Sequence, residues 1–504
     1  MGYWFERALP EEVGISRDSL SRLLTRILSL RITLHGLVIV KKGKVITEMN
    51  WKPYHNDDLH RMYSISKSFT SLAVGCLIDE GKLHYEDRVC TFFPEKLPEH
   101  LHHYISDATV RDLLMMATPH SDQSYTVNDR DWSGTFFQKH PSHPAGTIFH
   151  YDTAGAVVLC EIVEKITGMP YYQYLRRRLF DPIEASKNIY CIKTPEGTSW
   201  GGSGLVMSLH DLAKSGYVCM HHGMWKGKQI LPRDYIDEAV SKKIDNSMEG
   251  GDGYGYQIWR LKKNGFGFLG MGGQNVWCFP DLDLLFACTA DDQCDETNND
   301  LLLKQAVYDF ITENTNEQNS DCLQGKCGRS DSSQNKAVEG DAAGASDFFT
   351  AYKDMEFPEP AGSASSKWQE KVNGKWYVME ENPMEIRRFC LAFSGNEAKF
   401  IYENARGRKE ILFGMKKFVP GELPELYFDR QIGTKGNRKY RTLASAAWVE
   451  PHKLYIRVCV TDDYLGGLHI EISFKKNEVG MHMKKTAEWF LEDYQGFAGG
   501  MEEN

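Results

Sequence analysis

A long polar stretch interrupts the chain about two-thirds of the way along its length. Residues 315–346, TNEQNSDCLQGKCGRSDSSQNKAVEGDAAGAS, contain almost no large apolar side chains. Such a stretch buries too little apolar surface to offset the entropy lost on ordering, so we predict a flexible linker. The full chain has 504 residues, more than a single hydrophobic core usually organises. The sequence therefore predicts two domains, residues 1–314 and residues 347–504.

The first part of the chain mixes strand and helix patterns. Residues 34–51 read as two strands around a KKGK turn, and apolar helical patterns follow in the middle of the domain. Two strand-like runs, residues 253–263 and 275–291, precede a last amphipathic helix that ends near residue 314. Strands at both ends with helices between them predict an α/β (α+β) fold, in which helices flank one antiparallel sheet.

The second part of the chain has a different sequence pattern. Short runs of alternating apolar and polar residues, such as KWYVMEE, AKFIYEN and KLYIRVCV, are separated by turn residues. Eight or nine such strands with one short helix, TAEWFLEDYQ at residues 486–495, predict a small antiparallel β-barrel.

Composition narrows the range of partners. Hydrophobic residues make up 41% and charged residues 25%, and the formal net charge is −10. A negative balance argues against nucleic acid or an anionic membrane as the main partner. The N-terminus carries no apolar signal-peptide core, and no run of about 18 apolar residues predicts a membrane span. Cysteines lie mainly within apolar segments, as free thiols do in a reducing compartment, so we expect a cytoplasmic protein: Cys76, Cys160, Cys219 and Cys288.

A serine and a lysine three residues apart open the most apolar helical segment, SISKSFTSLAVGCLIDEGKL. The Ser-x-x-Lys pattern occurs three times, but only Ser64 and Lys67 fall where a helix would place both on one face. Ser333–Lys336 lies in the predicted linker. Ser473–Lys476 lies on a predicted strand, where residues three apart face opposite sides.

Chemistry explains why these two residue types would be paired. A serine hydroxyl is a poor nucleophile until a base removes its proton, and a lysine stripped of water can lose its own proton near neutral pH. The Ser64 N–H at a helix start would also supply half of an oxyanion hole. The plain alternative is that Ser64 caps the helix while Lys67 reaches the surface, and this segment alone leaves both open.

Further segments carry a resemblance to a known family. In order along residues 8–313 they are RMYSISKSF, TVRDLLMMAT, PAGTIFHYDTAGAVV, GGSGLVMSLHDLAKSG and GMGGQNVWCFPDLDLLFACTAD. Together they resemble serine hydrolases of the class C beta-lactamase and penicillin-binding-protein-like family, in its esterase and amidase branch. The resemblance implies a beta-lactamase-like domain in which Ser64 is the nucleophile and Lys67 its base.

The family's second motif, Tyr-x-Asn or Tyr-x-Ser, corresponds here to Tyr151, Asp152 and Thr153. The resemblance implies that Tyr151 carries a proton between Ser64 and the leaving group, its ionisation helped by Lys67. Thr153 keeps a hydroxyl but not an amide, and would lie among the substrate-binding groups. The alternative for Tyr151 is a half-buried aromatic residue that precedes a helix.

The third motif departs from the family pattern. Many relatives carry Lys-Thr-Gly or His-x-Gly there, whereas GFGFLGMGGQ has no Lys or His between Gly265 and Gln274. Glycines still allow a ligand to approach the backbone, so a backbone N–H of Gly270, Met271 or Gly272 is a candidate second oxyanion donor. Without the cation, recognition of a substrate carboxylate becomes doubtful. A simple tight turn is the alternative.

The resemblance implies a hydrolase that cleaves an ester or amide bond of a small molecule through a Ser64 acyl-enzyme, with no metal or organic cofactor. Three alternatives stay open: an acyltransferase with an alcohol or amine acceptor, a D-aminopeptidase or beta-lactamase-like activity, and a catalytically silent binding protein. The C-terminal part resembles lipocalin-like barrels appended to some bacterial members. Covering the active site, forming a homodimer and holding an apolar ligand are its open roles.

Overall fold

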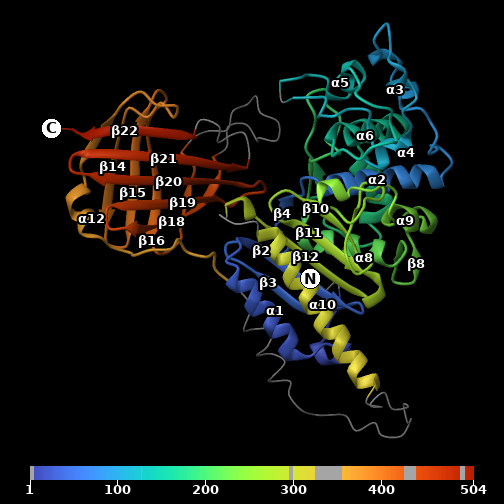
Figure 1. Ribbon diagram of the computed structural model, residues 1–504, viewed down its shortest axis with the longest axis horizontal. Coiled ribbons are helices and arrows are strands. Elements are labelled where there is room, and N and C mark those ends of the chain that lie inside the picture. The colour runs from blue at the N-terminus through green and yellow to red at the C-terminus, as the bar shows by residue number, and fades with distance from the viewer. Residues whose placement is uncertain are drawn as a thin grey trace. The chain divides into compact units, whose positions relative to one another are not determined.

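The computed structural model describes residues 5–126, 128–294, 299–323, 355–424, 439–487 and 494–503. These residues form two compact units (Figure 1). The first unit consists of Met1–Asp292 and Thr297–Glu356, and the second of Gln293–Glu296 and Phe357–Asn504. The domain boundaries expected from the sequence remain a prediction, because residues 324–354 lie outside the described part of the chain.

The first unit is built on one sheet whose strands come from both ends of the domain. Its order is β1-β3-β2-β12-β11-β10-β9, and every pair is antiparallel except β1 with β3. All residues of β2 and β12 are buried, which requires cover on both faces. The strands are β1 Glu6–Arg7, β2 Leu34–Lys41, β3 Lys44–Asn50, β9 Trp259–Arg260, β10 Phe266–Gly270, β11 Gln274–Phe279 and β12 Leu284–Ala290.

Helices provide that cover. The amphipathic helix α1 (Arg17–Ser29) packs along α10 (Asn299–Leu323), and Arg22–Glu313 and Arg26–Asp309 ion pairs join the two. The helix α8 (Leu209–Met220) packs on β11 and β12, and its N-cap Ser208 accepts a hydrogen bond from the Asp211 N–H. This arrangement confirms the predicted α/β (α+β) class of helices flanking an antiparallel sheet.

The middle of the first unit is a helical lobe centred on α2 (Ile65–Asp79), whose first thirteen residues are all buried. The apolar helix α6 (Thr153–Thr167) packs against α2 and ends at Gly168, which has a φ of 68°. The other α-helices described in this unit are α3 His103–Ser106, α4 Val110–Leu114, α5 Trp132–Gln138, α7 Tyr171–Leu175 and α9 Arg233–Val240.

A small second sheet leads the chain into α2. Strand β6 (Leu205–Ser208) lies between β4 (Leu59–Arg61) and β5 (Tyr190–Cys191). Pairing of β4 with β6 places the residues before Ser64 beside the residues that follow Gly202. A short hairpin of β7 (Met224–Trp225) and β8 (Lys228–Gln229) lies apart from this sheet.

The second unit contains a closed antiparallel barrel, as predicted. Nine of its described strands form the ring β16-β15-β14-β13-β22-β21-β20-β19-β18, which a parallel β16–β18 bridge closes, and β17 extends one edge of β18. The elements are α12 Lys367–Val372, β13 Trp376–Met379, β14 Arg388–Ser394, β15 Glu397–Asn404, β16 Gly407–Met415, β17 Val419–Glu422, β18 Arg441–Glu450, β19 Lys453–Val460, β20 Gly466–Lys475, β21 Glu478–Ala487 and β22 Gly496–Glu502.

Several element boundaries differ from those expected. The run at residues 253–263 keeps only β9 as strand, because Gly253, Gln257 and Lys263 have positive φ angles that interrupt pairing. The run at residues 275–291 is two strands, separated at Pro280. Helix α10 continues past residue 314 to Leu323, since neither glycine nor proline occurs before Gly325.

In the barrel, β17 and the glycine-rich β22 were not expected from the pattern. Most of the predicted helix at residues 486–495 lies outside the described residues. Among the helices that the structure describes, none is long and apolar enough to cross a membrane.

Candidate active site

Ser64 occupies the turn that joins the small sheet to α2. The preceding Tyr63 has a φ of 48°, a strained value for a bulky residue, and is buried beneath the Arg61 guanidinium, which lies 4.4 Å from its ring centroid. Although Ser64 is the N-cap residue, its side chain makes no capping hydrogen bond. The Ser64 hydroxyl is therefore not used to start the helix, contrary to the plain alternative.

Lys67 lies one helical turn further on, with only 1% of its surface exposed. Its Nζ donates to Ser64 Oγ at 3.1 Å and to the Gly202 carbonyl at 2.8 Å. Lys67 therefore does not reach the surface. Burial lowers the pKa of its ammonium to about 7, although the nearby Asp152 carboxylate opposes this shift. A neutral amine is thus available beside the serine at physiological pH.

Tyr151 completes the cluster. The Ser64 side chain lies close enough to the Tyr151 phenol to influence its pKa, and Lys67 Nζ lies 4.9 Å from the Tyr151 ring centroid. The ring stacks on Trp259 at 5.5 Å, beside the cluster of Met116, Phe149 and Tyr254. Burial raises the pKa of Tyr151 to about 12, so the residue holds its proton at neutral pH. The structure therefore brings the three predicted side chains together, with a lysine base and a protonated phenol.

A glycine loop, residues 201–204, contacts Lys67, and the sequence patterns predicted no role for it in the site. Thr70 Oγ1 donates to the Gly201 carbonyl at 2.9 Å, and Arg61 Nε donates to the Ser203 carbonyl at 2.9 Å. These bonds fix the loop so that the Gly202 carbonyl faces Lys67. A Cβ built on Gly202 would lie 2.4 Å from the Thr153 methyl. Thr153 therefore packs against this loop, and the GGSG sequence was the only signal of such close approach.

Asp152 lies between Tyr151 and Thr153 and is fully buried. One carboxylate oxygen accepts a hydrogen bond from the Thr118 hydroxyl at 3.0 Å, and the other accepts from the Ala154 N–H at 2.9 Å. Burial raises the pKa of Asp152, while both hydrogen bonds and the charge of Lys67 oppose that rise. Sequence patterns identified Asp152 only as the middle residue of the motif.

The third predicted motif lies at the end of β10, next to the serine turn. A Cβ on Gly270 would lie 2.3 Å from the Met62 carbonyl and 3.3 Å from the Ile65 side chain, so only glycine lets β10 approach the start of α2. Met271 is 38% exposed in the following turn, where Gly272 has a φ of 80°. Their geometry places this turn beside α2, and the oxyanion roles of Gly270, Met271 and Gly272 remain predictions.

The family model described as Beta-lactamase matches residues 29–303, which is more than half of the chain. The chain belongs to the beta-lactamase family. The match covers every residue of the cluster described above.

Two of the matched relatives are named as a hydrolase and an amidase. The chain is 24% identical over 308 residues to the 6-aminohexanoate-dimer hydrolase of Paenarthrobacter ureafaciens, covering 55% of this chain and 78% of that one. It is 26% identical over 183 residues to an N-acetylmuramyl-L-alanine amidase of Bacillus subtilis strain 168, covering 31% and 42% respectively. A candidate 6-aminohexanoate-dimer hydrolase from Bacillus anthracis shares the fold, with a TM-score of 0.50 and 18% identity over 64% of this chain and 88% of that one.

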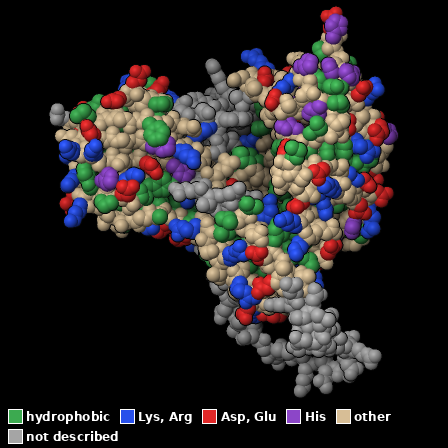
Figure 2. All heavy atoms as spheres, in the orientation of Figure 1, with side chains coloured by type: hydrophobic (Ala, Val, Ile, Leu, Met, Phe, Trp, Pro, Cys, Tyr) green, Lys and Arg blue, Asp and Glu red, His purple; other side chains and the backbone are tan. Residues whose placement is uncertain are grey.

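Histidines do not assemble a metal site in the part of the chain that is described. Figure 2 shows histidine side chains at several places on the surface, and the His102 ring lies 4.5 Å from His103 and 5.4 Å from His140. Within the described residues no group of three His, Cys, Asp or Glu side chains could hold a metal ion.

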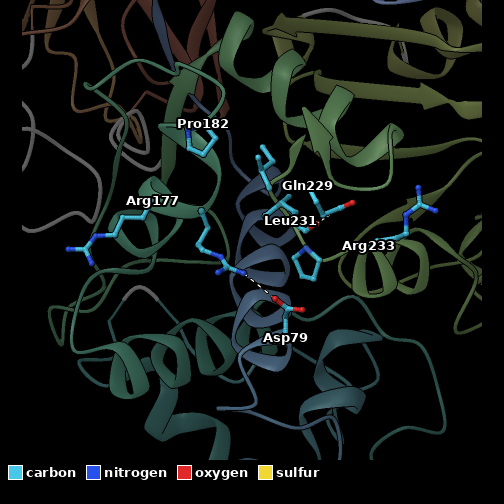
Figure 3. A pocket seen from close by; sticks show the side chains of 9 residues that line it. Asp79, Arg177, Pro182, Gln229, Leu231 and Arg233 are labelled. Carbon is cyan, nitrogen blue, oxygen red and sulfur yellow. Dashed lines mark hydrogen bonds and ion pairs between the residues drawn. The ribbon is translucent and has the colours of Figure 1, made fainter. Parts of the chain in front are cut away.

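A cavity of about 430 Å³ is separate from the serine cluster (Figure 3). It lies at the far end of α2 by Asp79, roughly 20 Å from Ser64 given the rise of a 15-residue helix. Arg178 is ion-paired with Asp79 at 3.2 Å, and Arg177 and Arg233 point away from one another. This cavity does not serve the reaction centre.

Proposed function

We propose that the protein is a serine hydrolase that cleaves a carboxylic ester or amide of a small molecule through an acyl-enzyme on Ser64. One observation carries the proposal: a lysine amine buried in the protein interior lies 3.1 Å from a serine hydroxyl that is not used as a helix cap. A pKa near 7 supplies that amine in its neutral form at physiological pH.

The first step forms the acyl-enzyme. Neutral Lys67 accepts the Ser64 proton while Ser64 Oγ attacks the substrate carbonyl carbon. The Ser64 N–H and a backbone N–H from residues 270–272 would hold the resulting oxyanion, and Thr153 would lie among the groups that line the substrate. As the tetrahedral intermediate collapses, Tyr151 gives its proton to the leaving group and regains one from the Lys67 ammonium. No metal or organic cofactor enters these steps.

The second step releases the acyl group. A water molecule attacks the acyl carbon, and the neutral amine at Lys67, with Tyr151, removes the water proton. Collapse of this intermediate breaks the bond to Ser64 Oγ, which takes back a proton. Bond making and proton transfer balance over the cycle, so that one water is consumed for each ester or amide cleaved.

Substrate preference follows from the third motif. The segment from Gly265 to Gln274 supplies no lysine or histidine to pair with a substrate carboxylate. We therefore propose a substrate that is recognised without a carboxylate next to the scissile bond. The names of two matched relatives, a 6-aminohexanoate-dimer hydrolase and an amidase, support an amide among the substrates.

A substrate panel tests this proposal. p-Nitrophenyl esters of increasing acyl length and short p-nitroanilides should be hydrolysed, and a neutral substrate should be preferred to its carboxylate-bearing analogue. Ser64→Ala should abolish turnover without changing the far-UV circular dichroism spectrum. Ser473→Ala, in another Ser-x-x-Lys sequence, is the matched control and should retain full activity. Undiminished turnover in Ser64→Ala would overturn the proposal.

A further inference from the structure

We propose that Asp152 is a positioning residue of this site, whose carboxylate anchors Tyr151 beside Ser64 and stabilises the ammonium that forms on Lys67 during acylation. This inference rests on the proposed function and assigns a role to a residue that is neither the nucleophile nor its base. Its support comes from how the carboxylate is held, what surrounds it and what the reaction requires of Lys67.

The carboxylate of Asp152 is held rigidly. Thr118 Oγ1 donates to one oxygen at 3.0 Å, and the N–H of Ala154, the second residue of α6, donates to the other at 2.9 Å. The Asp152 N–H also points to Met116 Sδ at 3.4 Å. Since Tyr151 directly precedes Asp152, these anchors fix the backbone from which the phenol reaches Ser64.

A helix cap alone does not explain this residue. Serine, threonine and asparagine cap helices as well as aspartate does, and none of them carries a charge. Burying a carboxylate completely is costly unless a partner charge compensates. Lys67 from α2 lies beside both neighbours of Asp152: its Nζ is 4.9 Å from the Tyr151 ring centroid, and it donates to the carbonyl of Gly202, which packs on Thr153. Lys67 and His150 both act electrostatically on the carboxylate, and of these two only Lys67 is buried. Asp152 therefore pairs a structural role with an electrostatic one.

Other titratable groups also face Asp152. Tyr125 comes from the segment before α5, and its phenol donates no charge because burial keeps it protonated. His150 and Tyr151 come from the same segment as Asp152. Among these groups, Lys67 alone gains a proton in the proposed acylation step. The effect of the carboxylate on the reaction should therefore pass through Lys67.

The proposed reaction explains why a negative charge near Lys67 is useful. Desolvation by itself would lower the pKa of Lys67 so far that its amine would be a very weak base. A general base works best when its pKa lies near the working pH. The Asp152 carboxylate opposes desolvation and stabilises the ammonium after Ser64 has lost its proton. That proton then remains on Lys67 until Tyr151 has protonated the leaving group, and no further reactant is needed.

Titration of Lys67 tests the proposal. The intact protein labelled with 13C-lysine is followed by NMR from pH 5 to 10, in the wild type and in Asp152→Asn. We expect the Lys67 midpoint to fall by about 1 unit in Asp152→Asn, because removal of a nearby opposite charge lowers the pKa of an ammonium by that order. The burst of p-nitrophenol release should show the same shift in its acid limb, with the plateau rate falling roughly tenfold.

Control variants separate a charge effect from loss of a cap. Asp112→Asn removes another capping carboxylate, which accepts a hydrogen bond from the Thr109 N–H at 2.9 Å at the start of α4, and should leave the Lys67 midpoint unchanged. If Asp152→Asn does not fold, Asp152→Ser keeps a capping oxygen without the charge and should give the same shift. A Lys67 midpoint equal to the wild-type value in a folded Asp152 variant overturns the proposal.

Failure of the proposed function would look different. A wild-type protein that hydrolyses p-nitrophenyl esters without any covalent adduct on Ser64 would contradict the acyl-enzyme mechanism, while the NMR midpoint would still show whether Asp152 controls Lys67. A normal burst with an unshifted midpoint would contradict only the role of Asp152.

Discussion

Lys67 lies in an environment that does not suit a charged ammonium. A charged ammonium in the protein interior loses its hydration, and a single carbonyl at 2.8 Å with a serine hydroxyl at 3.1 Å replaces little of it. The buried lysine therefore destabilises the folded protein, and the same burial makes its amine a usable base, as is common in active sites.

Replacing Lys67 with methionine should separate stability from activity. Methionine fills a similar volume without a polar head, so Lys67→Met should raise the free energy of unfolding by about 1 kcal/mol or more at neutral pH. Turnover should fall by roughly 10³-fold or more, since the serine loses its base. Urea denaturation and steady-state kinetics on the same preparation measure both effects, and a variant that is both active and less stable would contradict this account.

The acylation rate should rise with pH across neutrality. Burial lowers the pKa of Lys67 in the folded protein to about 7, so the reactive neutral amine accumulates as the pH passes that value. Tyr151, at about 12, keeps its proton over the same range. Stopped-flow measurement of the p-nitrophenol burst from pH 5 to 9 should therefore show an acid limb with its midpoint near 7.

The same amine links pH to stability. In the unfolded chain lysine stays protonated to about pH 10.4, so between about 7 and 10 the unfolded state binds more protons than the folded state. The contribution of Lys67 to stability should therefore increase as the pH rises through this window. This increase should be absent in Lys67→Met.

At the scale of elements, the site depends on how closely α2, α6 and the glycine loop approach one another. The Gly202 carbonyl reaches Lys67 only because neither Gly201 nor Gly202 carries a side chain. A Cβ on Gly201 would lie 2.4 Å from Cys160 Cβ, and a Cβ on Gly202 would lie 2.4 Å from the Thr153 methyl. Both distances are too short for any real contact, so the loop would have to move away.

Gly202→Ala should therefore impair catalysis by displacing the carbonyl from Lys67. We expect kcat to fall about tenfold to a hundredfold, with a destabilisation of about 1–3 kcal/mol from overpacking. Gly480→Ala is the matched control, because a Cβ there meets nothing within 4 Å on the barrel surface. If Gly202→Ala had wild-type kinetics, the loop carbonyl would have no part in positioning the lysine.

Sequence patterns predicted those elements that local residues specify. The hairpin of β2 and β3 has a turn signal between two apolar runs, and α2 has an apolar surface on nearly every side. Strand β22 escaped prediction because its glycines have low strand propensity and it gains stability only from pairing with β13 and β21. The roles of the Gly202 carbonyl and the Asp152 carboxylate could not be predicted either, because their contacts join segments that are distant in sequence.

At the scale of the molecule, the predicted chemistry belongs to one of two units. Ser64, Lys67 and Tyr151 all lie in the first unit, and the Beta-lactamase family match at residues 29–303 falls almost entirely within it. The barrel of the second unit closes through its own strands, with a core formed by inward residues such as Phe400, Tyr402, Ile456 and Ile470. Each unit therefore has its own hydrophobic core.

We propose that the polar segment between residues 324 and 346 links the two units, and limited proteolysis tests this proposal. Trypsin or a glutamyl endopeptidase, each at low concentration, should cut there first. Mass spectrometry should then identify two protected fragments. The fragment that contains residues 29–303 should retain esterase activity, because it holds all three predicted catalytic side chains. First cleavage within β12 or within the barrel would contradict this division.

The most direct test of the central claim is to locate the covalent intermediate. A fluorophosphonate probe should add one phosphonyl group per chain, and peptide mass spectrometry should place it on Ser64. Labelling should be lost in Ser64→Ala and should slow sharply in Lys67→Met, whose serine has no base. An adduct on another residue, or no adduct in a folded protein that still hydrolyses p-nitrophenyl esters, would contradict the account.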